Sequence, residues 1–68
     1  MNRIQEERIR KGISQTEAAQ LIGISKGMLA MIELEQRNGS DEVKKKIAKF
    51  YNKPVGYLFF NEPLTYSV

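Results

Sequence analysis

Residues 15–33, QTEAAQLIGISKGMLAMIE, decide the fold of this chain. The pattern predicts two short helices joined by only three residues, Gly23-Ile24-Ser25. Helices joined this closely cross at roughly 90–120°, so the turn between them must be sharp. Gly23 tolerates the positive φ that such a turn requires. The small side chain of Ala19 lets the two helices approach each other closely.

Capping residues mark where both helices begin. Ser14 and Glu17 have the spacing of a capping box, in which each side chain bonds the backbone amide of the other residue. Ser25 is a second N-cap. The apolar positions of the first of these helices are Ala18, Ala19, Leu21 and Ile22. The residues expected to bury against one another where the two helices cross are Ala18, Ile22, Ile24, Leu29 and Ile32. The second helix is expected to end near Leu34 or Glu35.

Further helices are predicted on either side of this pair. The first helix covers residues 2–11 and ends at Gly12. A fourth covers residues 41–51 after an N-cap at Ser40, and residues 55–60 are long enough for a short fifth. The apolar face of the fourth helix consists of Val43, Ile47, Phe50 and Tyr51.

The composition excludes most catalytic chemistry. The 68 residues contain no cysteine and no histidine, which excludes a disulfide framework and a Cys- or His-ligated zinc site. The usual general base and the thiol nucleophile are also absent. We therefore expect neither an enzyme nor a cofactor or metal site. The longest apolar runs fall far short of the roughly 20 residues that span a bilayer, and the chain opens with charged residues rather than an apolar signal segment. A soluble cytoplasmic protein is expected.

The charge balance is mildly basic. Eleven Lys and Arg residues against eight Asp and Glu residues give a net charge of +3. This bias permits a nucleic acid or an anionic membrane surface as partner and proves neither. The run Lys44-Lys45-Lys46 is interpreted as a solvated helix face, with at most one lysine near a phosphate.

An ordered set of residues spread over residues 4–59 resembles a known family. The set comprises Ile4, Arg8, Lys11-Gly12-Ile13-Ser14-Gln15, Ala19, Gly23-Ile24-Ser25, Leu29, Ile32-Glu33, Arg37-Asn38, Ser40, Ile47-Ala48, Pro54-Val55 and Leu58-Phe59. It is similar to the Cro/C-repressor (XRE) class of bacterial and phage helix-turn-helix proteins. The resemblance implies an all-α, lambda-repressor-like fold, a compact bundle of four or five short helices. It also implies a sequence-specific regulator of transcription that binds double-stranded DNA, such as a repressor or Cro-like switch protein of a phage or mobile element.

The resemblance also implies where DNA is bound. Residues 1–60 would form the DNA-binding domain, with a recognition helix at about residues 26–34 in the major groove. The residues expected at the DNA are Gln15, Thr16, Ser25, Lys26, Gly27, Met28, Met31, Arg37 and Asn38. Of these, Gln15 would touch a phosphate and brace the recognition helix, a place where free helix amides also favour an anion. Arg8 and Glu33 would form a salt bridge between the first and third helices.

The chain departs from the family pattern in the recognition helix. Met28, Ala30 and Met31 stand where the family usually has polar residues. Methionine cannot make a bidentate hydrogen bond to a base. Base preference is therefore expected to depend on Lys26, bound to guanine or phosphate, and on apolar contacts with thymine methyl groups. Gly27 lets the backbone approach closely but weakens the helix by about 1 kcal/mol relative to alanine.

Three departures lie outside the recognition helix. Glu35 stands where the family often has glycine and Gly39 where it often has proline, so a looser loop is expected. Glu7 replaces a frequent apolar residue, which is expected to thin the core under the first helix.

Simpler interpretations of these residues stay open at this point. Met28 and Met31 fit core packing as well as a binding face. Arg8 and Glu33 fit an ordinary surface pair worth under about 1 kcal/mol. In the same way, Gln15 fits a solvated residue of a first helical turn. The residues Arg37 and Asn38 fit a plain loop.

The methionine-rich surface also supports a function of another class. An antitoxin or anti-regulator could keep the fold and bind a protein partner through Met28, Ala30 and Met31, because methionine suits adaptable protein contacts.

The C-terminal residues 61–68 are interpreted as a tail that contributes to a homodimer. A short recognition helix reads only about four base pairs, and two-fold pairing on a near-palindromic site overcomes that limit. Apolar and polar residues alternate over residues 64–68, which predicts a short strand. The expected dimer contacts are Tyr57, Phe59, Phe60, Leu64 and Tyr66. The alternative is that Phe60 packs inside the monomer and the tail frays.

Overall fold

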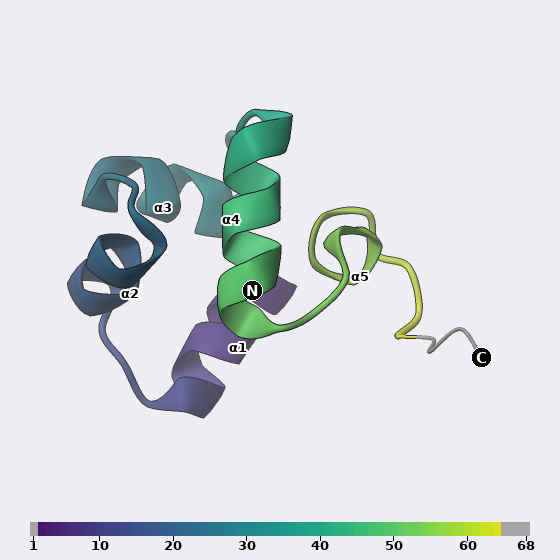
Figure 1. Cartoon of the computed structure of the whole chain (residues 1–68), viewed down its shortest axis with the longest axis horizontal. Coiled ribbons are helices and arrows are strands. Elements are labelled where there is room, and N and C mark those ends of the chain that lie inside the picture. Colours follow the sequence, from purple (N-terminus) through teal and green to yellow (C-terminus); the bar gives the residue numbers. More distant parts are fainter. Residues whose placement is uncertain (1, 65–68) are drawn as a thin grey trace.

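Five helices make up the fold in the computed structural model, which describes residues 2–64 (Figure 1). They are α1 (Arg3–Lys11), α2 (Gln15–Ile22), α3 (Lys26–Glu33), α4 (Asp41–Tyr51) and α5 (Val55–Phe59). Residues 2–64 contain no strand, and the strand predicted at 64–68 falls, apart from Leu64, outside the described residues. None of the described helices has both the length and the apolar character that a membrane crossing needs.

Side-chain caps account for the start of four helices. The side-chain oxygens of Asn2, Ser14, Ser25 and Ser40 accept hydrogen bonds from the backbone amides of Gln5, Glu17, Met28 and Val43. The three predicted serine caps are thus confirmed. Gly12, Gly23 and Asn52 close α1, α2 and α4 in the left-handed conformation. The helix bounds therefore follow from local chemistry that the sequence displays.

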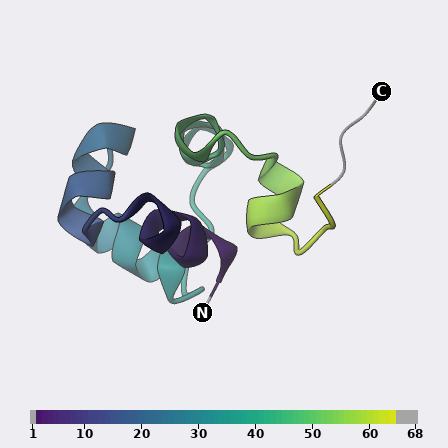
Figure 2. The ribbon, with the colours of Figure 1, turned by 90° about the horizontal axis from the view of Figure 1, so that it is seen from below.

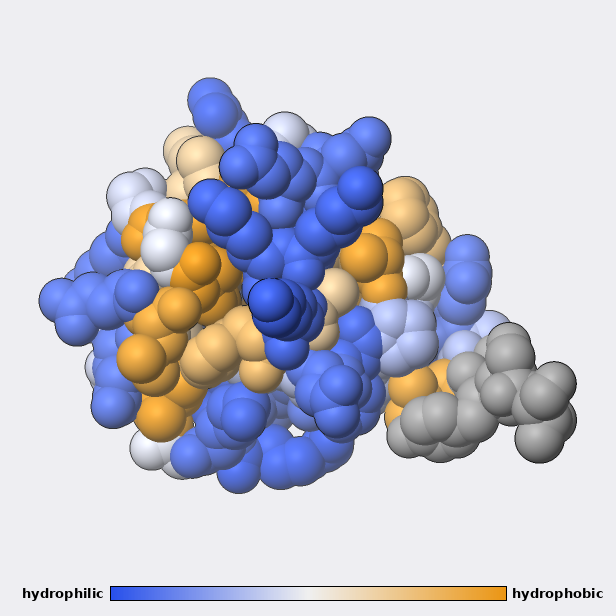
Figure 3. All heavy atoms as spheres, in the orientation of Figure 1, coloured by the Kyte–Doolittle hydropathy of each residue, from blue (hydrophilic) through white to orange (hydrophobic). Residues whose placement is uncertain are grey.

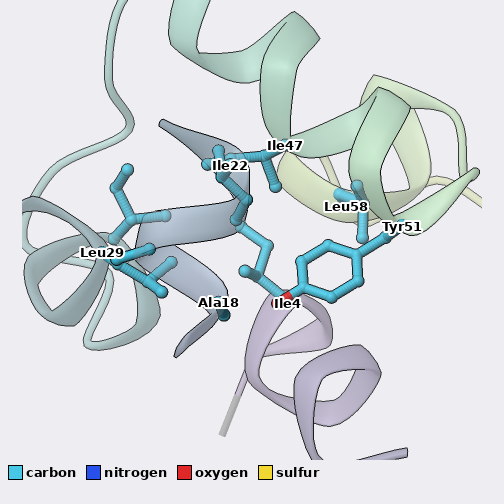
Figure 4. Close-up of a cluster of buried hydrophobic side chains, with 9 residues drawn as sticks. Ile4, Ala18, Ile22, Leu29, Ile47, Tyr51 and Leu58 are labelled. Carbon is cyan, nitrogen blue, oxygen red and sulfur yellow. The ribbon is translucent and has the colours of Figure 1, made fainter. Parts of the chain in front are cut away.

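The core lies where α1, α2, α3 and α4 meet, and Leu58 of α5 completes it (Figure 4). The buried apolar residues are Ile4, Ala18, Ala19, Ile22, Leu29, Ile32, Ile47, Tyr51 and Leu58. Viewed from below, α2 and α5 lie at opposite ends of the molecule, with α1 and α4 between them (Figure 2). This arrangement separates the helix pair that decides the fold from the C-terminal end of the chain.

Leu21, one of the apolar positions of α2, has 61% of its surface exposed. Ala18, Ala19 and Ile22 form the buried face of α2. At about 100° per residue, Leu21 lies to one side of that face. Apolar character alone therefore does not place a residue on the buried face of this helix.

Glu7 lies in α1, at the position where a thinner apolar core was expected. Its carboxylate is buried, with Arg10 Nη1 at 2.8 Å from Oε2 and Lys53 Nζ at 3.6 Å from Oε1. The hydroxyl of Tyr57 donates to the same carboxylate at 3.4 Å. This cluster joins α1 to α5 and to the α4–α5 loop, so polar contacts connect these elements at this position.

The segment between α3 and α4 contains two residues in the left-handed conformation. Glu35 has φ 63° and Gly39 has φ 80°. Glycine adopts this conformation without strain, whereas for other residues it costs about 1–2 kcal/mol. Glu35 therefore has the left-handed backbone conformation that suits the glycine often found at this position in the family.

Candidate nucleic-acid interface

A tight turn fixes α3 against α2. Gly23 has φ 94°, as predicted, and its amide and that of Ile24 both donate to the carbonyl of Ala19, at 2.9 and 3.0 Å. Ala19 is fully buried beside the turn, which explains the need for a small side chain there. The predicted pair of crossing helices is therefore present, with the start of α3 immediately after the turn.

A buried ion pair then fixes the other end of α3. Arg8 donates from Nε to Glu33 Oε2 at 2.9 Å and from Nη2 to Oε1 at 3.2 Å, and from Nη1 to the carbonyl of Ile13 at 3.0 Å. The side chains of Arg8 and Glu33 are only 14% and 2% exposed. The hydrogen bond to Glu33 raises the pKa of Arg8, although desolvation opposes this rise. The pair is therefore a buried bidentate contact and not the surface pair of the simpler interpretation.

Gln15 joins this cluster from the start of α2. Its Nε2 donates to Glu33 Oε1 at 3.1 Å, so the side chain does brace α3 as the resemblance implied. Gln15 is half-buried, and Thr16 next to it is exposed. The backbone amides of these two residues donate to no acceptor within residues 2–64. Two free amides at a helix N-terminus suit an anion such as a phosphate.

Asn2 makes a contact with α3 that the sequence did not predict. Besides capping α1, its side-chain amide donates to the carbonyl of Ile32 at 2.8 Å. The N-terminus of α1 and the C-terminus of α3 are thereby tied together. An N-cap asparagine was the only available signal, and it said nothing of a partner 30 positions away.

The exposed side of α3 carries most of the predicted recognition residues. Ser25, Lys26 and Gly27 are exposed, and Met31 is 38% exposed. Met28 is half-buried and packs against the core, so the interpretation as core packing applies to it in part. Leu34, directly after the helix, is 69% exposed and was not among the predicted site residues.

The loop after α3 returns to the end of that helix. The amides of Gln36 and Arg37 both approach the carbonyl of Met31, at 2.9 and 3.4 Å. Arg37 and Asn38 are exposed. The structure thus brings the predicted loop residues to the C-terminal end of α3, while Gln15 braces the same end through Glu33.

The predicted dimer residues lie at the opposite end of the molecule. Tyr57 and Phe59 are half-buried against the core, and Phe60 is 55% exposed. The guanidinium of Arg3 lies 4.3 Å from the centroid of the Tyr57 ring, and Lys44 Nζ lies 5.2 Å from that of Phe60. Leu64 is half-buried, whereas Tyr66 lies outside the described residues.

Hydrophilic side chains cover α4 on the face shown in Figure 3, and apolar side chains gather beside it on the α2 side. Lys45 and Lys46 are exposed, as expected for a solvated helix face. Lys44 is half-buried because its amine approaches the rings of Phe59 and Phe60.

One buried polar atom stands apart from these contacts. Tyr51 extends from α4 toward α1, and its hydroxyl has no hydrogen-bond partner among residues 2–64 (Figure 4). Burial raises the pKa of Tyr51 to about 12, with a further rise from the Glu33 carboxylate and an opposing effect of Arg8. Among the described residues there is no cluster of three acidic, histidine or cysteine side chains that could hold a metal ion.

Comparison with known proteins agrees with this geometry. A family model described as helix-turn-helix matches residues 4–58, which is most of the chain. The match covers α2, α3 and α4 completely, and it covers α1 and α5 apart from Arg3 and Phe59. A comparison with curated proteins gives no match.

Proposed function

Because the chain belongs to the Cro/C-repressor (XRE) helix-turn-helix family of DNA-binding regulators, we propose that it is a sequence-specific regulator of transcription, acting as a repressor or Cro-like switch protein. In this proposal α3 lies in the major groove of double-stranded DNA. Regulation then results from occupying DNA, or from contact with another protein bound nearby.

The observation that carries the proposal is the rigid support of α3. Its N-terminal end follows the Gly23 turn, and its C-terminal end is held through Glu33 by Arg8 and Gln15. A helix that must enter a groove in one orientation needs support at both ends. The same support leaves the Lys26–Met31 side of α3 accessible.

Each predicted site residue has a role in this arrangement. The free amides of Gln15 and Thr16, with the Gln15 side chain, hold one phosphate. The side chains of Arg37 and Asn38, in the loop after α3, hold the DNA backbone as well. Base edges are read by residues at the start and along the exposed side of α3: Ser25, Lys26, Gly27, Met28 and Met31.

The salt dependence of binding tests this assignment. Arg37→Ala is expected to weaken binding to all DNA sequences about equally and to reduce the slope of log K against log salt by about one. Lys26→Ala is expected to relax preference at one or two base pairs, at a cost of about 1–3 kcal/mol. Lys49→Ala is the matched control, since it removes the same charge from an exposed position on α4. Loss of affinity for a single sequence in Arg37→Ala, or unchanged base preference in Lys26→Ala, would contradict the roles given to these residues.

We further propose that residues 1–60 form the DNA-binding domain and that residues 61–68 contribute to a homodimer. Exposed Phe60 supports this proposal, because burial in an interface removes its ring from water. Deleting residues 62–68 is expected to shift the mass measured by analytical ultracentrifugation to that of a monomer. Affinity for a two-half-site operator should then fall sharply, with half-site affinity little changed. A truncated protein that stays dimeric would rule out this interface.

A second candidate function is a protein-interaction module such as an antitoxin or anti-regulator. The observation that favours it is the exposure of Met31 and Leu34 on and just after α3. The two functions differ in a titration with random duplex DNA. Absent or salt-independent binding, together with a tight protein partner, would support the second function.

A further inference from the structure

The outward side of α3 is an apolar stripe. Gly27, Met31 and Leu34 are spaced by four and three residues, so they lie along one side of the helix and its first following residue. All three are exposed, Met31 at 38% and Leu34 at 69%. The opposite side carries the buried residues Leu29, Ile32 and Glu33. We call Gly27, Met31 and Leu34 the outward stripe.

Few hydrogen-bonding groups on α3 are free to read a base edge. Lys26 and Glu33 are the polar side chains of the helix. Both carboxylate oxygens of Glu33 already accept hydrogen bonds from within the protein. The side chains that remain to form hydrogen bonds with bases are therefore Lys26 and the hydroxyl of the capping residue Ser25. The apolar feature that the major groove offers to such a surface is the C5-methyl group of thymine.

Gly27 carries the second part of the inference, because the fold does not require a glycine there. A Cβ built at Gly27 meets no atom within 4 Å, and the residue lies inside α3. Gly23 and Gly39, by contrast, have positive φ. Alanine favours a helix over glycine by roughly fivefold, so glycine at this position weakens α3. A close approach of the helix backbone to a ligand accounts for this choice.

The positive charge at its two ends favours DNA over an apolar protein surface as the ligand of the outward stripe. Lys26 lies at the N-terminal end of the outward stripe. At the other end, the exposed residue Arg37 follows Leu34 by three positions, in the loop that returns to the Met31 carbonyl. An exposed cationic residue thus stands at each end of a narrow apolar surface. Phosphates flank the thymine methyl groups of a major groove in the same way.

Resting on the proposed DNA-binding function, we propose that the outward stripe reads thymine methyl groups at close range. Met31 is the principal contact, and Gly27 is the point where the α3 backbone comes nearest to the base edges. The thymines of the half-site then contribute to affinity through their methyl groups. Hydrogen bonding from Lys26 adds a preference at one further base.

Uracil substitution tests this inference, since uracil differs from thymine only in lacking the methyl group. The probe is a duplex selected by the full-length protein from a random DNA pool, with single thymines of the half-site replaced by uracil. Each methyl group buried by the outward stripe is expected to contribute about fourfold to affinity. The slope of affinity against salt should not change, because no phosphate contact is lost.

In Met31→Ala, duplexes with uracil and with thymine should bind equally at the position that Met31 reads. Ile9→Ala, at an exposed isoleucine of α1, should keep the wild-type discrimination.

Gly27→Ala provides the second, independent measurement. The melting temperature should be unchanged or higher, while affinity for the selected duplex should fall at least tenfold. A variant that melts as well as the wild type and binds as tightly would overturn the role of Gly27. Equal affinity of the wild type for thymine and uracil at every position would overturn methyl recognition and leave DNA binding intact. A protein that selects no duplex from the pool would overturn the inference together with the proposed function.

Discussion

Removing the Glu33 carboxylate should nearly unfold this protein. In Glu33→Ala the guanidinium of Arg8, only 14% exposed, loses both hydrogen bonds to its partner. Breaking a buried ion pair on one side costs about 3–5 kcal/mol, because an uncompensated charge stays buried. At about 0.05–0.15 kcal/mol per residue, a chain of 68 residues has a free energy of unfolding of roughly 3–10 kcal/mol. The expected loss is thus a large part of the total.

Thermal denaturation followed by circular dichroism measures this loss. In a domain of this size, each 1 kcal/mol lowers the melting temperature by about 4–8 °C. Glu33→Ala should therefore melt at least about 12 °C below the wild type or be unfolded at room temperature. Glu33→Gln keeps the shape and one acceptor oxygen, so its melting temperature should lie between those of the other two proteins.

An exposed ion pair of the same chain provides the control. Glu42 Oε1 lies 3.8 Å from Lys46 Nζ, and the Glu42 side chain is 80% exposed. Glu42→Ala should therefore change the free energy of unfolding by less than about 1 kcal/mol. If Glu33→Ala melted within about 3 °C of the wild type, as Glu42→Ala is expected to do, the support of α3 by a buried pair would be wrong.

Three further substitutions test the structure by stability alone. Tyr51→Phe removes a buried hydroxyl that has no partner among the described residues, so it should stabilise the protein by about 1 kcal/mol in urea unfolding at neutral pH. The pKa of Tyr51 is raised to about 12, so the folded protein keeps a proton that the unfolded chain loses near pH 10. The free energy of unfolding of the wild type should therefore fall between pH 10 and pH 12. Tyr51→Phe should remove that part of the fall. Gly23→Val places a β-branched residue at φ 94° and should lower stability by more than about 1 kcal/mol; an unchanged melting temperature would refute the turn. Glu35→Gly should raise stability by about 0.5–1 kcal/mol, because glycine adopts φ 63° without strain, and a lower melting temperature would contradict this account of the loop.

Local signals predicted the helices well, because caps and breakers act within a few residues. Ser14, Ser25 and Ser40 each cap the helix that was expected after them. The predicted turn at Gly23 has the expected positive φ. The exposure of Leu21 was not predicted, because helical spacing leaves the edge of a buried face undefined. Asn2 was missed as an anchor of α3 because its second partner depends on the tertiary fold.

The candidate site could be predicted from the sequence only as a set of positions. The resemblance paired Arg8 with Glu33, but the burial of that pair emerges only when α1 and α3 pack together. Met28 and Met31 look equivalent in the sequence, yet only Met28 packs against the core. Likewise, Glu7 has an environment formed by Lys53 and Tyr57, some 50 positions away, which no local pattern encodes.

Chemical-shift mapping tests the central claim most directly, namely that α3 and its flanking amides bind DNA. Backbone amide resonances of the full-length protein would be followed while a duplex selected from a random pool is added to saturation. The largest changes are expected at the start of α2, at residues 26–31 and at Arg37, with small changes at Lys45 and Lys49 on α4. Changes confined to α4 and α5, or unchanged α3 resonances at saturation, would contradict the proposal that this protein reads DNA through α3.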